Sequence, residues 1–158
     1  MSRSPIEVVQ AVLANSTNLQ ALGELVADDV TYVALNYDNA ELKKVLPWAG
    51  TGHGPQHIVD TFTRVGKYWK IKAFEVKEIF GSGDNVAVFG SVTIQSNTLG
   101  KTVTSPFSIL AKVTGGKVSY MQFLEDSFGS ASTFRTEGVW HFQADPNGAE
   151  VRLGATKA

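Results

Sequence analysis

The stretch LGELVADDVTYVA, residues 22–34, changes from a helical pattern to a strand pattern. Apolar residues recur every three or four positions from Leu19 to Val26, which predicts a short helix that ends at Asp28. The next residues, VTYVALNY at 30–37, are rich in β-branched and aromatic side chains and predict a strand. A helix that leads directly into a strand indicates a mixed fold.

Two further helices are predicted, one on each side of this stretch. Ser4, Pro5 and Glu7 have the spacing of an N-cap, a first-turn proline and a capping-box glutamate, so a helix begins there. Gly54 and Pro55 begin another helix, over about residues 55–68. Both helices should turn apolar faces into one core, and in the second helix that face consists of Ile58, Phe62, Val65 and Trp69.

Downstream of this helix the pattern becomes that of an antiparallel meander. Four strand-like stretches are separated by the turn sequences GSGD, TLG and GG: KIKAFEVKEIFG, NVAVFGSVTIQSN, KTVTSPFSILAKVT and KVSYMQFLEDS. We expect an α+β fold in which this curved antiparallel sheet packs on the N-terminal helices and forms a cone. The open end of such a cone suits an apolar pocket with a few polar groups.

The end of the chain is expected to add little to this core. Phe128, Ala131, Phe134 and Val139 have an approximately helical spacing, and polar residues follow them. We therefore expect one domain with a core over about residues 5–135, and a C-terminal helix and polar tail over 136–158.

Composition excludes several classes of function. The chain has 158 residues, a net charge of −1 and no run of basic residues, so nucleic acid is not an expected partner. It has no cysteine, which excludes disulfides and thiolate chemistry. It also lacks the apolar run of a membrane span or a signal peptide. The sequence therefore predicts a cytoplasmic protein with no membrane partner.

Three stretches carry a resemblance to a known family: LGELVADDVTYVA at 22–34, LPWAGTGHGPQHIVDTF at 46–62 and GGKVSYMQFLEDS at 115–127. With the order of elements, they resemble the nuclear transport factor 2-like (NTF2-like) superfamily, in particular its SnoaL-like branch, which is related to ketosteroid isomerase. The resemblance covers about residues 5–135. It implies a cone-shaped fold that hosts isomerases, cyclases, hydrolases, dehydratases and binding domains, so the residues of the site must decide the function.

Two catalytic patterns of that superfamily are not matched by this chain. The resemblance puts the base of ketosteroid isomerase at Ala34 and its acidic oxyanion donor near Ile109, and both residues are apolar. The Asp–Arg–Asp arrangement of limonene epoxide hydrolase needs an arginine in the core strands, and none is found there. We therefore expect neither steroid isomerase nor epoxide hydrolase chemistry of these kinds.

Strand alternation selects Glu125 as the leading catalytic candidate. If Met121 and Phe123 face the core, Glu125 faces it as well. A carboxyl group at the mouth of an apolar pocket has a raised pKa and can act as a general acid or base near neutral pH. Two alternatives remain open: Glu125 and Asp126 cap the next helix or pair with basic residues, or a bulge exchanges the faces and Asp126 takes the role.

Two other residues are candidates for a catalytic role beside this carboxyl group. Tyr32 could donate a hydrogen bond to a substrate oxygen, or it is an ordinary core residue. His53 lies in the stretch expected to border the cone mouth, where it forms a proton relay with Glu125 or is simply exposed. His53 and His57 have metal-ligand spacing, but with no third ligand we expect neither a metal nor another cofactor.

Two functional hypotheses follow from these residues. The first is a cofactor-independent SnoaL-like enzyme, of isomerase, cyclase or lyase type, acting by general acid/base catalysis on a small hydrophobic oxygenated substrate. The second is a non-catalytic module that binds a small hydrophobic molecule in the same pocket. Outward-facing Leu110 and Leu124 suggest a homodimer through the outer sheet face. The expected substrate-binding residues are Asn36, Trp48, Phe62, Phe107, Ile109, Met121 and Phe123.

Overall fold

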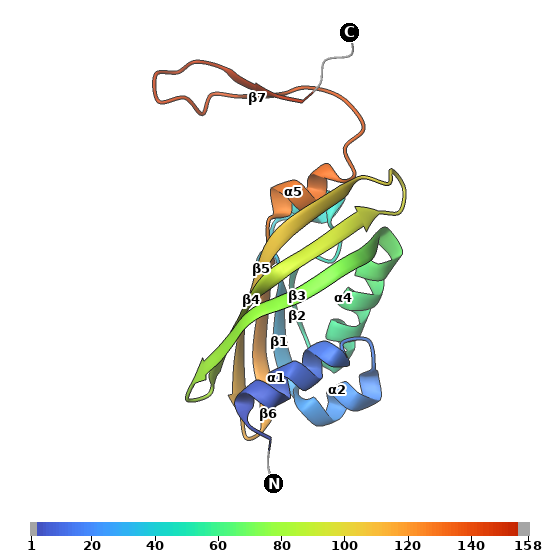
Figure 1. Cartoon of the computed structure of the whole chain (residues 1–158), viewed down its shortest axis with the longest axis vertical. Helices are drawn as coiled ribbons and strands as arrows, with labels where there is room; N and C mark the ends of the chain where they lie inside the picture. Colours follow the sequence, from blue (N-terminus) through green and yellow to red (C-terminus); the bar gives the residue numbers. More distant parts are fainter. Residues whose placement is uncertain (1–2, 155–158) are drawn as a thin grey trace.

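The first two helices begin at side-chain caps and pack against the sheet (Figure 1). The computed structural model of the protein describes residues 3–154. Helix α1 (Pro5–Ala14) has the predicted capping box, in which the backbone N–H of Glu7 donates to the hydroxyl of Ser4. Helix α2 (Leu19–Leu25) is capped by the side chain of Asn18. Because α2 ends at Leu25, the first strand begins earlier than the sequence pattern predicts.

The main sheet has six strands in the order β2-β1-β6-β5-β4-β3. The predicted meander is confirmed as β3 to β6, which pair in sequence as antiparallel neighbours. Strand β1 pairs with β6 in parallel, an arrangement that the sequence did not indicate. The strands span Val26–Ala34 (β1), Gly50–His53 (β2), Trp69–Ser82 (β3), Asn85–Ser96 (β4), Thr102–Thr114 (β5) and Lys117–Glu125 (β6).

The connection from β1 to helix α4 (Pro55–Tyr68) contains more structure than expected. It includes a short helix, α3 (Ala40–Val45), and then β2, which pairs antiparallel with β1. The glycine-rich stretch before α4 is therefore partly an edge strand and not only a loop. Helix α4 itself matches the predicted helix over 55–68.

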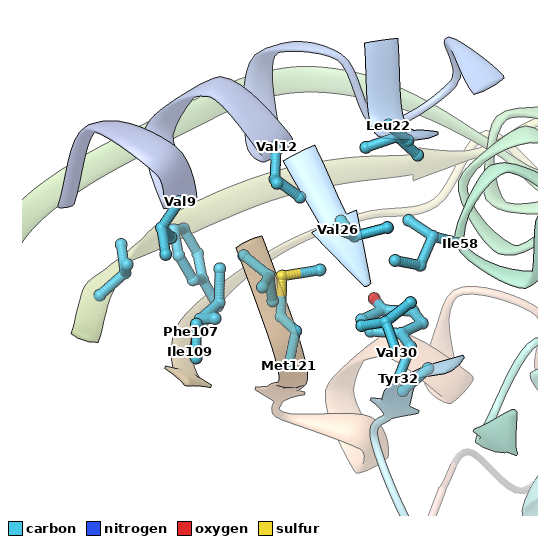
Figure 2. Packing of buried hydrophobic residues seen from close by; sticks show 14 of the residues in the cluster. Val9, Val12, Leu22, Val26, Val30, Tyr32, Ile58, Phe107, Ile109 and Met121 are labelled. Carbon is cyan, nitrogen blue, oxygen red and sulfur yellow. The ribbon is translucent and has the colours of Figure 1, made fainter. Parts of the chain in front are cut away.

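Helices α1, α2 and α4 lie on one side of the curved sheet and bury its inner face (Figure 1). Irregular pairing between Ile71 and Ala73, and again between Val76 and Glu78, accompanies the bend of β3. Figure 2 shows Val9 and Val12 of α1 in one buried cluster with Val26 of β1, Ile109 and Met121, among others. The expected α+β fold, with a curved sheet packed on N-terminal helices, is confirmed.

The C-terminal segment differs from the expected helix and polar tail. Helix α5 spans only Ser127–Ser132, and the chain then forms a hairpin of β7 (Trp140–Phe142) and β8 (Val151–Leu153). This hairpin extends away from the sheet and helices (Figure 1). The helical spacing that runs on to Val139 was therefore misleading. No helix within residues 3–154 is both long and apolar enough to cross a membrane.

Candidate functional site

A cavity of about 340 Å³ lies between the helices and the inner face of the sheet. Its lining comes from the end of α1 and the turn to α2, from α4, from β1, β3, β4 and β6, and from the segment between β1 and β2. Most of the lining side chains are apolar or aromatic, and Glu125 is the single carboxyl group among the described lining residues. The lining consists of Leu13, Ser16, Thr17, Tyr32, Ala34, Leu35, Trp48, Thr61, Phe62, Val65, Gly66, Trp69, Ile71, Phe74, Val92, Ile94, Phe123 and Glu125.

Glu125 is the last residue of β6, where strand alternation turns it into the cavity as predicted. Its neighbour on β5 is the buried Phe107. Burial raises the pKa of Glu125 from its ordinary value of 4.5 to about 7, because the apolar surroundings disfavour the charged carboxylate. The described residues form no salt bridge with it. Near neutral pH, both protonation states of this carboxyl group are therefore populated.

Two neighbours adjust the pKa of Glu125 in opposite directions. The Ser130 hydroxyl lowers it by stabilising the charged form, and the negative charge of Asp126 raises it. This hydroxyl is buried and makes no hydrogen bond of standard geometry within the described residues. Desolvation of Glu125, which acts in the same direction as Asp126, is the largest of the three effects and outweighs the lowering by Ser130, so the net pKa shift is upward.

Asp126 does not share the environment of Glu125. It is the N-cap of α5, where its Oδ1 accepts a hydrogen bond of 2.9 Å from the backbone N–H of Gly129. Its own backbone N–H donates to the Ser105 hydroxyl over 2.8 Å. The helix-capping alternative therefore describes Asp126, while Glu125 faces the cavity.

Tyr32 lies on β1 and lines the same cavity. Burial first, and then the charge of Glu125, raise the pKa of its phenol above the ordinary range, so the hydroxyl keeps its proton and remains a donor. The ring stacks on Phe62 of α4 at a centroid distance of 5.9 Å, which fixes its position in the wall. The cavity thus combines one carboxyl group that titrates near neutrality with one neutral phenol.

Aromatic side chains form much of the remaining wall. Trp48 and Trp69 meet edge to face at 4.6 Å, and the Trp69 indole N–H donates to the Thr133 hydroxyl. Phe123 lines the cavity, and Phe107 lies behind the wall, stacked between Phe74 and Phe123 at 4.6 and 5.3 Å. Phe107 therefore supports two lining rings instead of lining the cavity itself.

The predicted binding residues thus separate into three groups. Trp48, Phe62 and Phe123 line the cavity. Phe107, Ile109 and Met121 are buried in the hydrophobic core, where the inward direction that alternation predicts leads to other side chains and not to the cavity. Asn36 is exposed beyond the end of β1, and its side chain accepts a hydrogen bond from the backbone N–H of Asp38.

The structure does not bring His53 to Glu125. His53 is the exposed last residue of β2, outside the cavity, with its Nδ1 3.2 Å from the Thr31 hydroxyl. His57 is partly buried against Gly52, and its Nε2 has no hydrogen-bond partner among the described residues. Within residues 3–154, no group of three or more histidine, cysteine or acidic side chains could hold a metal ion.

The family model described as a SnoaL-like domain matches residues 8–121, most of the chain. The protein belongs to the SnoaL-like domain family. Patulin synthesis protein F of Aspergillus clavatus is 44% identical over 140 residues, covering 85% of this chain and 71% of the relative. Patulin biosynthesis cluster protein F of Penicillium expansum is 41% identical over 152 residues, covering 92% and 76%.

Solved structures share the fold of this SnoaL-like domain. An NTF2-like protein of Burkholderia thailandensis has a TM-score of 0.72 and 21% identity, covering 85% of this chain and 99% of its own. TerC, co-crystallised with polyporic acid, has a TM-score of 0.69 and 22% identity, covering 84% and 100%. At these identities the likeness shows the fold alone, and it confirms the expected NTF2-like fold, while the SnoaL-like assignment rests on the family model.

Several lining residues of the SnoaL-like domain were not predicted from the sequence. Val92 and Ile94 could have been found from the alternation of β4, which buries every second residue near them. Val65 and Trp69 belong to the apolar stripe predicted for the helix over 55–68, although the structure makes Trp69 the first residue of β3. The turn residues Ser16 and Thr17 and the glycine of α4 had no signal, because only the packing of distant segments brings them to the cavity.

Proposed function

We propose that this SnoaL-like domain is a cofactor-independent enzyme of isomerase, cyclase or lyase type. In this proposal Glu125 transfers a proton to and from a small hydrophobic, oxygenated substrate that fills the cavity. The observation that supports it most is one largely desolvated carboxyl group, with a pKa of about 7, in a cavity lined mostly by apolar and aromatic side chains. A base of that pKa combines a populated charged form with useful proton affinity at neutral pH.

The proposed chemistry assigns different tasks to Glu125 and Tyr32. The Glu125 carboxylate removes a proton from a carbon next to a substrate carbonyl group, and the electron pair moves onto the carbonyl oxygen. The Tyr32 phenol donates a hydrogen bond to that oxygen and stabilises its negative charge. Protonated Glu125 then returns the proton to the same carbon or to another atom, so the proton balance closes without a cofactor.

The fungal relatives support a biosynthetic role. Both carry names that associate them with patulin synthesis, and both are more than 40% identical to this chain over most of its length. We therefore place the proposed activity in the biosynthesis of patulin or a similar small molecule. The cytoplasmic location expected from the sequence remains a prediction.

We also propose that the protein forms a homodimer through the outer sheet face. Leu110 and Leu124 are exposed there, as predicted, and Phe89 is exposed on the same face of β4. Phe89 and Leu124 flank the small Ser108 across β4, β5 and β6. Leu110 follows two residues after Ser108 on the same face of β5, so the three apolar side chains form an exposed patch around this serine. An exposed apolar patch of this kind is typical of a protein interface.

The probe 2-tetralone, a small cyclic ketone with exchangeable protons, tests the proposed chemistry. Its hydrogen–deuterium exchange in D2O is followed by NMR, and its binding by tryptophan fluorescence. We expect the protein to accelerate exchange, with the rate rising as pH passes 7, and Glu125→Gln to abolish the acceleration while binding is retained. Glu24→Gln, at an exposed position of α2, is the matched control and should exchange the probe as the unmodified protein does.

Two results would contradict this proposal. Equal acceleration by the Glu125→Gln variant would show that another group removes the proton. Binding of the probe without acceleration at any pH between 5 and 9 would favour the non-catalytic binding module.

A further inference from the structure

The exposure of the lining residues locates the mouth of the cavity. Tyr32 is 2% exposed and Ile94 1%, so these residues lie deep in the cavity. Ile71 and Phe74 on the edge strand β3 are each 46% exposed, although both line the same cavity. Exposed lining residues also occur in the turn between α1 and α2 and near the end of α4. The mouth therefore lies where these three segments border the cavity.

Gly66 is the residue that α4 contributes to this mouth. It is exposed and it lines the cavity, two residues before the helix ends at Tyr68. A glycine within a helix lowers stability relative to alanine because it loses more backbone entropy on folding. Glycine at this position therefore lowers the stability of the fold, so its presence calls for a structural or functional reason.

Neither the backbone nor the packing requires a glycine at this position. Gly66 is helical and is not among the glycines with a positive φ angle. A Cβ atom built on it would meet no atom within 4 Å, so a side chain would enter open space. By contrast, a Cβ on Gly90 of β4 would lie 2.0 Å from the Glu75 carbonyl oxygen, so the fold itself requires that glycine. Gly66 lacks any such structural reason.

We propose that Gly66 is a specificity-determining residue, which keeps the mouth wide enough for a flat ring to enter between α4 and the edge strand. This inference rests on the proposed function only in taking the cavity as the substrate site. A larger residue at this position would extend into the mouth and exclude broad molecules before narrow ones. The size limit of the substrate is thus set partly by α4 and not only by the deep aromatic wall.

The chain provides a matched control in Gly23. This glycine is also exposed and helical, and a Cβ atom at its position would likewise meet no atom within 4 Å, but it lies on α2 and does not line the cavity. Alanine at either position should stabilise the helix and raise the Tm by about 2 °C. Leucine at either position adds the same apolar side chain, so a difference between the two variants reports on the mouth.

The experiment measures entry into the cavity through the fluorescence of Trp48 and Trp69. Trp140→Phe removes the exposed indole of the C-terminal hairpin and serves as the common background. The probe is 4-nitroanisole, a flat neutral ring whose nitro group quenches tryptophan, and its association is followed by stopped flow. We expect Gly66→Leu to slow association about tenfold and Gly23→Leu to change it by less than about twofold.

Acrylamide, a much smaller quencher, shows whether the effect depends on size. Its quenching constant should change by less than about twofold in Gly66→Leu, because a narrowed mouth still admits it. Equal association of 4-nitroanisole in the two leucine variants would overturn the proposal. This outcome would leave the proposed chemistry of Glu125 untouched, whereas a failure of the 2-tetralone exchange test would leave the assignment of the mouth intact.

Discussion

Replacing Glu125 by glutamine should stabilise the fold at alkaline pH. The carboxyl group lines the cavity and is largely desolvated, and its pKa of about 7 lies well above the ordinary value of 4.5. In the unfolded chain the same group ionises in water at its ordinary pKa. Between these two values the folded protein binds more protons than the unfolded chain, so stability falls as the pH rises.

The size of this effect follows from the two pKa values. One pH unit of difference corresponds to about 1.4 kcal/mol, so the contrast between 4.5 and about 7 amounts to about 3 kcal/mol. This contribution is fully present below pH 4.5 and is lost by the time the pH has risen above 7. Glutamine has nearly the same shape and never ionises, so the variant should lack this loss.

Urea unfolding at pH 4.5, 6 and 8 measures the prediction directly. The free energy of unfolding of Glu125→Gln, relative to the unmodified protein, should rise by about 3 kcal/mol between the lowest and the highest pH. Glu24→Gln, at an exposed position of α2, provides the control for replacing a carboxylate outside the cavity. A flat difference for Glu125→Gln across this range would refute the reasoning, because it would mean that the carboxylate is hydrated in the folded state.

Two further predictions concern the neighbours of the site and the outer sheet face. Ser130→Ala should raise the pKa of Glu125 further, because the hydroxyl stabilises the charged form; the midpoint of the 2-tetralone exchange profile should move to higher pH, and an unchanged midpoint would contradict this. Leu124→Glu should convert the predicted homodimer into a monomer, since it places a charge in the apolar patch of Phe89, Leu110 and Leu124; a monomer of the unmodified protein in analytical ultracentrifugation would contradict the dimer.

The sequence predicted the meander and the inward face of β6 because both depend on local patterns. Turns that contain Gly, Asn and Asp separate the strands. Strand β6 pairs regularly with β5, from the pair Ala111–Met121 to the pair Phe107–Glu125. Alternation therefore holds as far as Glu125, where a one-residue bulge would have reversed it. The prediction was correct here because the register is undisturbed.

Other parts of the site depend on contacts that no local pattern contains. The parallel pairing of β1 with β6 places Tyr32 opposite Met121 and Ala34 opposite Phe123. His53 was expected at the cone mouth, but its position on β2, antiparallel to β1, sets it opposite Thr31 on the outer side. The lining turn and Gly66 meet the cavity only through tertiary packing.

The adjacent residues Glu125 and Asp126 show how one junction separates two carboxyl groups. The strand ends with Glu125 facing the cavity, and the next residue leaves the sheet to cap α5. The cap begins the helix that carries Ser130. The Ser130 hydroxyl in turn lowers the pKa of Glu125 and so offsets part of the rise that desolvation causes. Asp126 therefore acts on Glu125 in two ways, directly through its charge and indirectly by helping to fix the helix that supplies the hydroxyl. Because the two influences have opposite signs, they partly cancel, and the desolvation of the carboxylate, which is the largest cause, sets the upward direction of the pKa shift of Glu125.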